Sequence, residues 1–272
     1  MLNEKLISIL KCIECEQKLI YEDANLKCTK CNKTYRVIDD IPLMLKSDQQ
    51  NMRWEDYFRE ISKKEGDTEA ANTYFSVKNF NFLKDNILKL IGNVESLSIL
   101  DVGCGTGHFS QSLSKNNFLV GIDISLEMLM FAKRKGFDVI QSSGEKLPVE
   151  DNSFDMVVSN NVMQLVKDGK TFIEELLRVA KPGGRIIVST INGQNITLNL
   201  FRIIERKIYE NLRVYTGDEI KQYFLHNGGF IKSALFLYFP FGKAKLAEGN
   251  KELNFFEKFI STSFAVEAIK PA

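Results

Sequence analysis

Short apolar stretches alternate with amphipathic segments from residue 98 onward. Aliphatic and β-branched residues dominate the stretches, which is typical of buried strands. The segments between them place apolar residues at helical spacing, as in Phe172, Leu176 and Val179. Regular alternation of strand and helix predicts an α/β fold with a parallel sheet and right-handed crossovers. The predicted strands are 98–102, 118–122, 138–142, 154–159 and 184–190.

The pattern changes after the fifth predicted strand. Residues 191–215 form an insertion whose apolar residues follow helical spacing, with arginines and a lysine between them, and they predict an amphipathic surface helix. Thr216-Gly217-Asp218-Glu219 is typical of a capping box, so a second helix is expected to begin there. Residues 231–239 and 263–269 predict the last two strands.

The chain before residue 98 divides into two predicted parts. Residues 1–46 contain four cysteines, and a polar linker follows them. Trp54, Tyr57 and Phe58 then begin a segment rich in aromatic residues at helical spacing. The predicted units are a small module at 1–46, a linker with cap helices at 47–93, and a larger domain at 94–272.

The four N-terminal cysteines form two close pairs. Cys12 and Cys15 are separated by two residues, as are Cys28 and Cys31, and twelve residues lie between the pairs. Each pair can offer two thiolates from one turn, and two pairs complete the tetrahedral shell of a closed structural zinc site. Four protein ligands leave no open position, so a structural Zn²⁺ is predicted in preference to a catalytic one. The other interpretations are a disulfide pair or vestigial cysteines.

The first predicted strand of the larger domain ends in a glycine-rich turn. Gly103, Gly105 and Gly107 accept positive φ and have no Cβ, so the turn can bring backbone N–H groups close to a ligand. Asp101 precedes the turn, and Asp123 ends the next strand. An acid before the turn would repel a pyrophosphate but suits an ammonium group, while Asp123 lies where a ribose diol is bound. The two acids favour S-adenosyl-L-methionine over NAD.

These motifs resemble, in order and spacing, those of the class I S-adenosylmethionine-dependent methyltransferases. The resemblance is greatest to the type-11 branch, which includes the quinone-biosynthesis methyltransferases. The cysteine module with its continuation at 34–45 resembles the small zinc ribbons that activate tRNA and protein methyltransferases. The segments that resemble methyltransferase motifs are 99–107, 120–125, 144–148, 152–160 and 181–184.

The resemblance implies a Rossmann-like methyltransferase sheet of seven strands behind a small N-terminal zinc ribbon. The sheet would be mostly parallel, with the last strand antiparallel and the last two strands paired. The helices of 47–93 would cover the cofactor, with Tyr74 and Phe75 either forming a lid or packing in the interior. Residues 191–215 would be a substrate lid, which is the alternative to a plain surface helix.

The resemblance also implies the roles of individual residues. Asp101 would hold the methionine ammonium and Asp123 both ribose hydroxyls, while Ile124 would lie on one face of the adenine. Ser143 stands where many family members have an aspartate and would accept more weakly from the adenine amino group. Asn160 would border the methyl group and the substrate. The implied cofactor-binding residues are Asp101, Gly103, Gly105, Gly107, Asp123, Ile124, Ser143, Gly144, Glu145 and Asn160, and the implied metal ligands are Cys12, Cys15, Cys28 and Cys31.

Such an enzyme acts mainly by holding a nucleophile in line with the electrophilic methyl group of the sulfonium. A general base is not evident, because His108 follows the last glycine and His226 lies at a predicted helix end. Gln164 stands near where some relatives carry a histidine over the substrate, and it cannot take a proton. The base therefore comes from elsewhere, or the acceptor is itself acidic.

Composition adds limits on location and partners. The 272 residues are 44% hydrophobic with a net charge of +1, which indicates a globular chain without an overall field for nucleic acid or membranes. No apolar run is long enough to span a bilayer, and residues 1–10 lack the features of a signal peptide. We therefore expect a cytoplasmic protein.

Several functions remain open at this stage. The leading hypothesis is methyl transfer to a small or carrier-bound metabolite. The second is an RNA methyltransferase that reads RNA with its ribbon, a domain order found in a bacterial guanine-N1 ribosomal RNA methyltransferase, although the even charge of the ribbon weakens it. The third is a catalytically inactive, methyltransferase-like regulator, against which the intact glycines and acids argue. An NAD-dependent reductase is disfavoured by Asp101.

Overall fold

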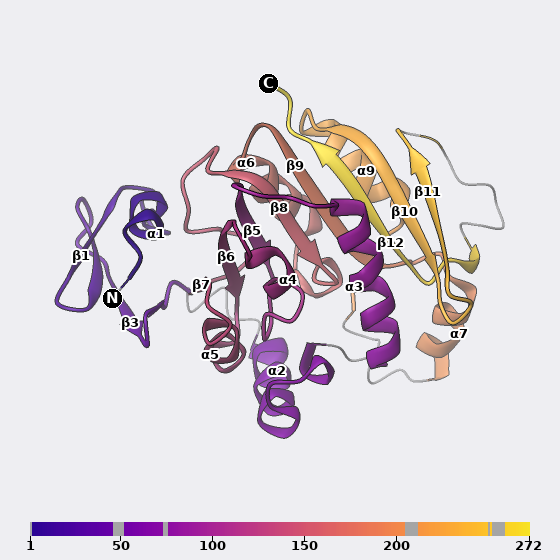
Figure 1. The fold of residues 1–272 in the computed structure, drawn as a ribbon, viewed down its shortest axis with the longest axis horizontal. Helices are drawn as coiled ribbons and strands as arrows, with labels where there is room; N and C mark the ends of the chain where they lie inside the picture. Colours follow the sequence, from indigo (N-terminus) through magenta and orange to yellow (C-terminus); the bar gives the residue numbers. More distant parts are fainter. Residues whose placement is uncertain (1, 46–51, 73–75, 205–211, 250, 252–258) are drawn as a thin grey trace.

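The computed structural model describes residues 2–45, 52–72, 76–204, 212–249, 251 and 259–272. Two sheets organise them, a four-stranded sheet near the N-terminus and an eight-stranded sheet that forms the body of the molecule (Figure 1). None of the helices in these ranges is long and apolar enough to cross a lipid bilayer.

The N-terminal sheet is an antiparallel meander with the order β1-β2-β3-β4. Its first two strands form a hairpin, and the turn contains Asp23 and Ala24 with φ of 48° and 56°. Positive φ at both central residues matches the right-handed twist of the two strands. We call this module, residues 2–45, the ribbon. Its elements are α1 (Glu4–Ile9), β1 (Leu19–Glu22), β2 (Asn25–Cys28), β3 (Thr34–Ile38) and β4 (Ile41–Pro42).

The large sheet has the strand order β11-β10-β12-β9-β8-β5-β6-β7. Strands β7, β6, β5, β8 and β9 are parallel, and β12 runs antiparallel to β9, as expected. The α/β fold class is therefore confirmed. The strands are β5 (Ser98–Val102), β6 (Phe118–Asp123), β7 (Asp138–Gln141), β8 (Phe154–Asn160), β9 (Ala180–Ile191), β10 (Phe230–Tyr238), β11 (Lys243–Glu248) and β12 (Ser263–Ile269).

The predicted count of seven strands is wrong, because β11 adds an eighth. This strand pairs antiparallel with β10 at the edge of the sheet. Along the chain it lies between β10 and β12, which are neighbours in the sheet. Only Ala247 in β11 is buried, and the strand contains no β-branched or aromatic residue, the types that are enriched in strands. Lys243 and Lys245 lie on this open edge, where charged side chains discourage pairing with another chain.

Helices cover both faces of the large sheet. Ile99 packs with Leu83 and Leu129 on one face, while its neighbour Leu100 shares a core with Phe172 and Phe224 on the other. This alternation follows from the two-residue period of a strand. On the first face lie α3 (Val77–Ile91), α4 (Gln111–Ser114) and α5 (Leu126–Lys133), and on the second lie α6 (Gly169–Val179) and α9 (Gly217–His226).

Further helical segments lie at one end of the sheet, at the bottom of Figure 1. Trp54, in the segment that follows the ribbon, packs against Ile191 at the end of β9 and against Leu198 of the insertion. These segments are α2 (Met52–Glu65), η1 (Glu69–Asn72), η2 (Met163–Leu165) and α7 (Ile196–Ile204). The lid candidates Tyr74 and Phe75, the linker at 46–51 and residues 205–211 of the insertion lie outside the described residues.

Candidate cofactor and acceptor site

The glycine turn after β5 leaves no space for side chains at two positions. Gly103 has φ of +81°, and a Cβ there would lie 2.1 Å from Cγ2 of Val162. Gly105 has φ of +54°, and its Cβ would lie 2.2 Å from Oδ1 of Asn72. The turn is also tied to the next strand, because Gly103 N donates to Ile122 O at 2.7 Å. Only glycine fits this backbone without displacing its neighbours.

Asp101 places a carboxylate beneath the turn. Its Oδ2 accepts from Ser110 Oγ, whereas Oδ1 is buried and has no hydrogen-bond partner among the described residues. Burial raises the pKa of Asp101 to about 7, and the nearby carboxylate of Asp123 raises it further. The hydrogen bond from Ser110 lowers this pKa, but by less than burial raises it. A buried carboxylate oxygen without a partner is costly and would be stabilised by a cation. It therefore suits an ammonium group.

Asp123 ends β6 and joins the turn to the following helix. Its Oδ2 accepts from Gly105 N at 2.9 Å, and its Oδ1 accepts from Ser125 N at 3.0 Å. Burial raises its pKa, although these N–H donors oppose the shift. Each carboxylate oxygen has capacity for a further hydrogen bond, so both can also accept from hydroxyl groups.

One pocket brings together nine of the ten cofactor residues predicted from the sequence. Gly107 is the exception, because its Cα faces the interior, and a Cβ there would lie 2.8 Å from Phe137 Cζ and 3.2 Å from Ala132 Cβ. That the nine contact a cofactor stays a prediction. They are Asp101, Gly103, Gly105, Asp123, Ile124, Ser143, Gly144, Glu145 and Asn160.

The loop after β7 forms one wall of this pocket. Ser143 Oγ accepts from Glu145 N at 3.2 Å, and Glu145 Oε1 accepts from Asp168 N at 2.8 Å. Asp168 is the N-cap of α6. A Cβ on Gly144 would lie 2.5 Å from Phe172 Cε2 of the same helix. Helix α6 thus supports the loop from behind.

Most of the other described residues of the pocket are apolar. The charged residues in its lining are Asp101, Asp123 and Glu145, and none of the lining residues that the structure describes is a lysine, arginine or histidine. Asn160 also lines the pocket, and its Oδ1 accepts from Ser189 Oγ at 2.7 Å. The pocket can therefore hold a cationic, ribose-containing ligand against its carboxylates and an apolar group against its aromatic and aliphatic side chains. Its apolar lining includes Trp54, Phe58, Phe80, Phe109, Val162, Leu165 and Val166.

Comparison with known proteins agrees with this geometry. Residues 100–188 match a family model described as a methyltransferase domain. The demethylmenaquinone methyltransferase of Lactococcus lactis is 30% identical over 176 residues, which cover 61% of this chain and 68% of that protein. The chain belongs to the S-adenosylmethionine-dependent methyltransferases.

Two other similarities bear on this methyltransferase. The malonyl-[acyl-carrier protein] O-methyltransferase of Buchnera aphidicola is 36% identical over 155 residues, 55% of this chain and 63% of that protein. A chain from a complex of the Haloferax volcanii Trm112 methyltransferase activator with a candidate methyltransferase superposes with a TM-score of 0.58 at 16% identity. That superposition covers 80% of this chain and 97% of the other, and at this identity it concerns the fold alone.

Sequence reasoning missed two residues that shape the methyltransferase pocket. Ser110 binds Asp101 from nine residues away, and Asn72 of η1 binds Thr106 of the glycine turn. Neither contact has a sequence signal, because both depend on how distant segments pack. The spacing of Trp54 and Phe58 indicated a helix, but not that both would line the pocket.

His108, His226 and Gln164 all lie outside this described lining. His108 Nε2 is 3.2 Å from Asp67 Oδ1, and His226 Nδ1 is 2.8 Å from Gln222 O at the end of α9. Gln164 is buried and donates to Asn161 O at 2.8 Å. Their contacts indicate structural roles.

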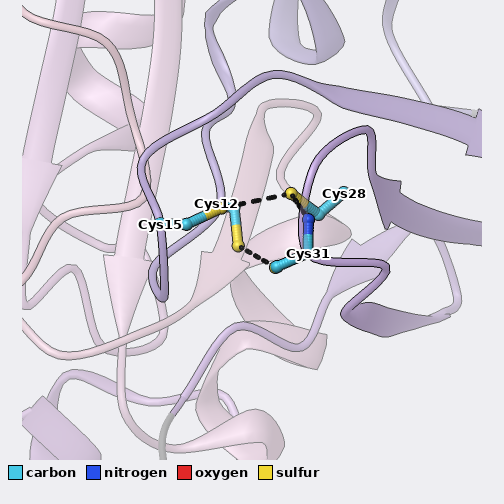
Figure 2. Close-up of side chains that lie close together, drawn as sticks. All are labelled: Cys12, Cys15, Cys28 and Cys31. Carbon is cyan, nitrogen blue, oxygen red and sulfur yellow. Dashed lines mark hydrogen bonds between the residues drawn. The ribbon is translucent and has the colours of Figure 1, made fainter.

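The four ribbon cysteines converge from two turns (Figure 2). All four are free thiols whose sulfur atoms lie within 4.8 Å of one another, with Cys12 and Cys31 at 3.7 Å and Cys15 and Cys28 at 3.4 Å. Zn–S bonds of about 2.3 Å in a tetrahedron place sulfur atoms about 3.8 Å apart, so the cluster fits Zn²⁺. Backbone N–H groups of Lys30 and Cys31 donate to Cys28 Sγ, which favours its thiolate.

Proposed function

We propose that this methyltransferase methylates a small or carrier-bound metabolite whose acceptor group contacts the apolar residues of the pocket. The observation that carries this proposal is the composition of the described lining, which combines three carboxylates with many apolar side chains and contains no cationic side chain. The lining carboxylates, Asp101, Asp123 and Glu145, are all among the residues proposed for the cofactor. Trp54 and Leu165, which belong to one apolar cluster, suit an aromatic or acyl group.

In the proposed arrangement, Asp101 binds the ammonium of S-adenosylmethionine and Asp123 accepts from the two ribose hydroxyls. Ile124 packs on the adenine, and Glu145 borders its edge. S-Adenosylmethionine supplies an electrophilic methyl group when bound. Asn160 borders the acceptor, and its amide, oriented by Ser189, positions the acceptor without moving a proton.

The proposed acceptor also supplies its own nucleophile. The described lining residues include no histidine or lysine to remove a proton, and the carboxylates there are assigned to the cofactor. A carboxylate, a phenol or an acidic carbon needs little or no help from a base. The printed names of two relatives, a demethylmenaquinone methyltransferase and a malonyl-[acyl-carrier protein] O-methyltransferase, support a quinone-like or carrier-bound acyl substrate.

RNA methylation is the second candidate, favoured by the ribbon and by the fold shared with a chain from a Trm112 complex. RNA binding requires a positive surface. Between residues 12 and 39 the ribbon exposes equal numbers of cations and acids, which does not favour RNA. The cations are Lys18, Lys27, Lys30, Lys33 and Arg36, and the acids are Glu14, Glu16, Glu22, Asp23 and Asp39.

One experiment separates the two candidates. The purified protein is incubated with methyl-labelled S-adenosylmethionine and a fractionated cell extract, beside an Asp101→Asn control. We expect label in the lipid, small-molecule or carrier-protein fraction, and none with the control. Label in an RNase-sensitive fraction would replace the metabolite proposal with the RNA one.

A further inference from the structure

The ribbon holds one end of the loop that forms the adenine side of the pocket. We call residues 142–150 the adenine loop. Leu43 of the ribbon pairs in parallel with Gln141 at the end of β7, the edge strand of the large sheet. Met44 N donates to Gln141 O at 2.8 Å, and Ser142 Oγ donates to Met44 O at 3.1 Å. The loop therefore begins on ribbon backbone.

The ribbon also holds the other end of the adenine loop. Leu10 pairs antiparallel with Val149. Lys11 N donates to Pro148 O at 3.0 Å, and Glu150 N donates to Ile9 O at 2.8 Å. The next residue along the ribbon is Cys12, the first cysteine of the cluster. The cluster is thus one residue away from the backbone ladder that ends the loop.

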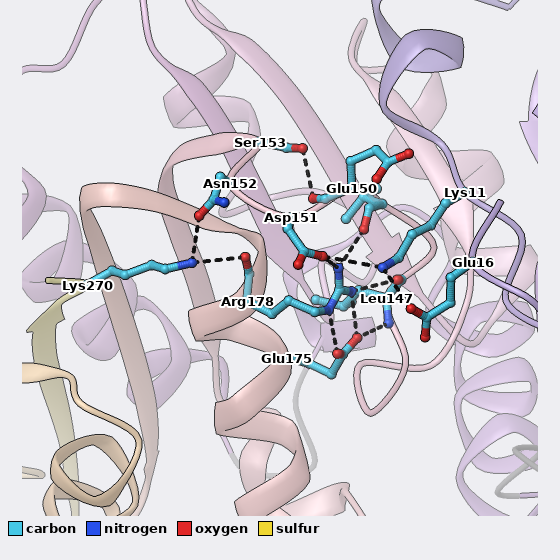
Figure 3. A network of polar contacts seen from close by, with 11 residues as sticks. Lys11, Glu16, Leu147, Glu150, Asp151, Asn152, Ser153, Glu175, Arg178 and Lys270 are labelled. Atoms are coloured by element: carbon cyan, nitrogen blue, oxygen red, sulfur yellow. Dashed lines mark hydrogen bonds and ion pairs between the residues drawn. The ribbon is translucent and has the colours of Figure 1, made fainter. Parts of the chain in front are cut away.

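Side chains connect this ladder to α6 (Figure 3). Lys11, whose side chain is 8% exposed, lies 3.3 Å from Asp151, and Asp151 accepts from Arg178 at 2.7 Å. Arg178 donates to Leu147 O at 2.9 Å, and Glu175 accepts from Leu147 N at 2.6 Å. Both backbone polar groups of Leu147 are therefore satisfied by α6.

Apolar packing makes the same connection. Leu10, Ile13 and Met44 of the ribbon belong to one buried cluster with Leu147 and Val149 of the adenine loop. Separating the ribbon from the loop would expose these side chains to water, which is unfavourable. The ribbon and the loop therefore form one packed unit.

We propose that the metal-bound ribbon is a clamp that fixes the adenine loop and thereby sets the affinity for the cofactor. Lys11 and Arg178 are its positioning residues. The inference rests on the proposed placement of adenine at Ser143, Gly144 and Glu145. Zn²⁺ at the four cysteines fixes the turn that follows Lys11, since such a module folds around its metal. A loosened loop would have to be ordered when the cofactor binds, which costs affinity.

The test uses the full chain and the product S-adenosylhomocysteine as a binding probe. Calorimetry measures its affinity for the zinc-loaded protein, the chelated protein and the zinc-loaded Lys11→Met variant. Hydrogen exchange follows peptides of the adenine loop, and Lys11→Arg tests for rescue by a conserved charge. Lys27→Met is the matched control, an exposed lysine on β2 of the same ribbon.

We expect chelation and Lys11→Met to weaken binding of S-adenosylhomocysteine by about tenfold, which corresponds to about 1.4 kcal/mol, because the loosened loop must be ordered when the ligand binds. Exchange in the adenine loop should become faster, and the KM for S-adenosylmethionine should rise while kcat is unchanged. 5′-Methylthioadenosine keeps adenine and ribose but lacks the amino acid. Its binding should weaken by the same factor. Lys11→Arg should restore affinity, and Lys27→Met should change nothing.

Three outcomes would overturn the clamp. Equal affinity of loaded, chelated and Lys11→Met proteins would show that the ribbon does not act on the cofactor. Faster loop exchange with unchanged affinity would show that adenine does not contact this loop. Failure of the unmodified protein to bind S-adenosylhomocysteine would instead overturn the proposed cofactor site, and the clamp with it.

Discussion

Asn72 and Thr106 form a reciprocal pair of hydrogen bonds. The amide of Asn72 donates to Thr106 Oγ1 at 2.6 Å, and its carbonyl oxygen accepts from Thr106 N at 2.9 Å. The same oxygen lies where a Cβ of Gly105 would be. The end of η1 is thereby fastened to the glycine turn, so the segment before the sheet takes part in shaping the pocket.

Replacing Asn72 should weaken cofactor binding. Asn72→Ala removes both bonds to the glycine turn and leaves Thr106 N without its partner, which costs about 1–3 kcal/mol. We expect a drop in affinity for S-adenosylhomocysteine of about tenfold by calorimetry. Asn86→Ala is the control, because its amide donates to Phe82 O within α3. Equal affinities of the two variants would argue against this role.

Cofactor affinity should depend on pH through Asp101. Its raised pKa of about 7 means that it binds a proton below pH 7, and the ammonium must then displace that proton. We expect affinity to fall as the pH drops from 8 to 6, and Asp101→Asn to bind weakly at both values. A pH-independent affinity in the unmodified protein would contradict this assignment.

The same group affects the stability of the cofactor-free protein. Its pKa is 3.8 in the unfolded chain and about 7 when folded, so the folded state binds the proton more tightly. The stabilising contribution of Asp101 to the free energy of unfolding is therefore present at low pH and is lost as the pH rises between about 4 and 7. Thermal unfolding measures this effect. Between about pH 4 and 7, the thermal midpoint of the unmodified protein should fall more steeply with rising pH than that of Asp101→Asn.

Gly103 and Gly136 both have positive φ but differ in the space around them. A Cβ on Gly103 would collide with Val162, whereas nothing lies within 4 Å of a Cβ on Gly136. Gly136→Ala should cost about 1 kcal/mol of stability through backbone strain and leave cofactor binding intact. Gly103→Ala should reduce cofactor affinity by more than about tenfold, because either the turn or Val162 must move. Calorimetry and thermal unfolding of both variants distinguish strain from collision.

The cysteine cluster should bind one Zn²⁺ per chain. Elemental analysis of the purified protein measures the metal, and Cys12→Ser should lower both the zinc content and the thermal midpoint, since small zinc modules generally fold around their metal. Cys104→Ala, at the cysteine in the glycine turn, should leave the zinc content unchanged. Full zinc content in Cys12→Ser would exclude Cys12 as a ligand.

Glu267 anchors a buried ion pair between β12 and the neighbouring strands. Only 1% of its side chain is exposed, and it accepts from Arg185 Nε at 2.8 Å and from Lys232 Nζ at 3.0 Å. Arg185→Met should lower the free energy of unfolding by about 2–3 kcal/mol, because the buried carboxylate loses the less exposed of its two cationic partners. Lys232→Met should cost no more than about 1 kcal/mol, since that side chain is half exposed. Urea unfolding of the two variants measures the difference.

The sequence by itself determined the alternation of elements and the chemistry of the motifs. Strands β5, β6, β7 and β8 begin at the predicted residues, because a buried strand must be apolar and its run of apolar residues is local. The capping box at Thr216 is confirmed for the same reason, since a cap depends on four adjacent residues. Edge strand β11 escaped prediction because it contains no β-branched or aromatic residue and lies exposed at the edge of the sheet, so its sequence lacks the usual composition of a strand.

Only the tertiary structure decided which distant residues meet. Asn72 reaches Thr106, and Ser110 satisfies one oxygen of Asp101 while the other stays unpartnered among the described residues. The ribbon holds both ends of the adenine loop largely through backbone groups, as in the pairing of Lys11 with Pro148. Backbone N–H and C=O groups are the same in almost every residue, so their pairing leaves no pattern in a sequence. It is set by how the ribbon packs against the edge of the large sheet.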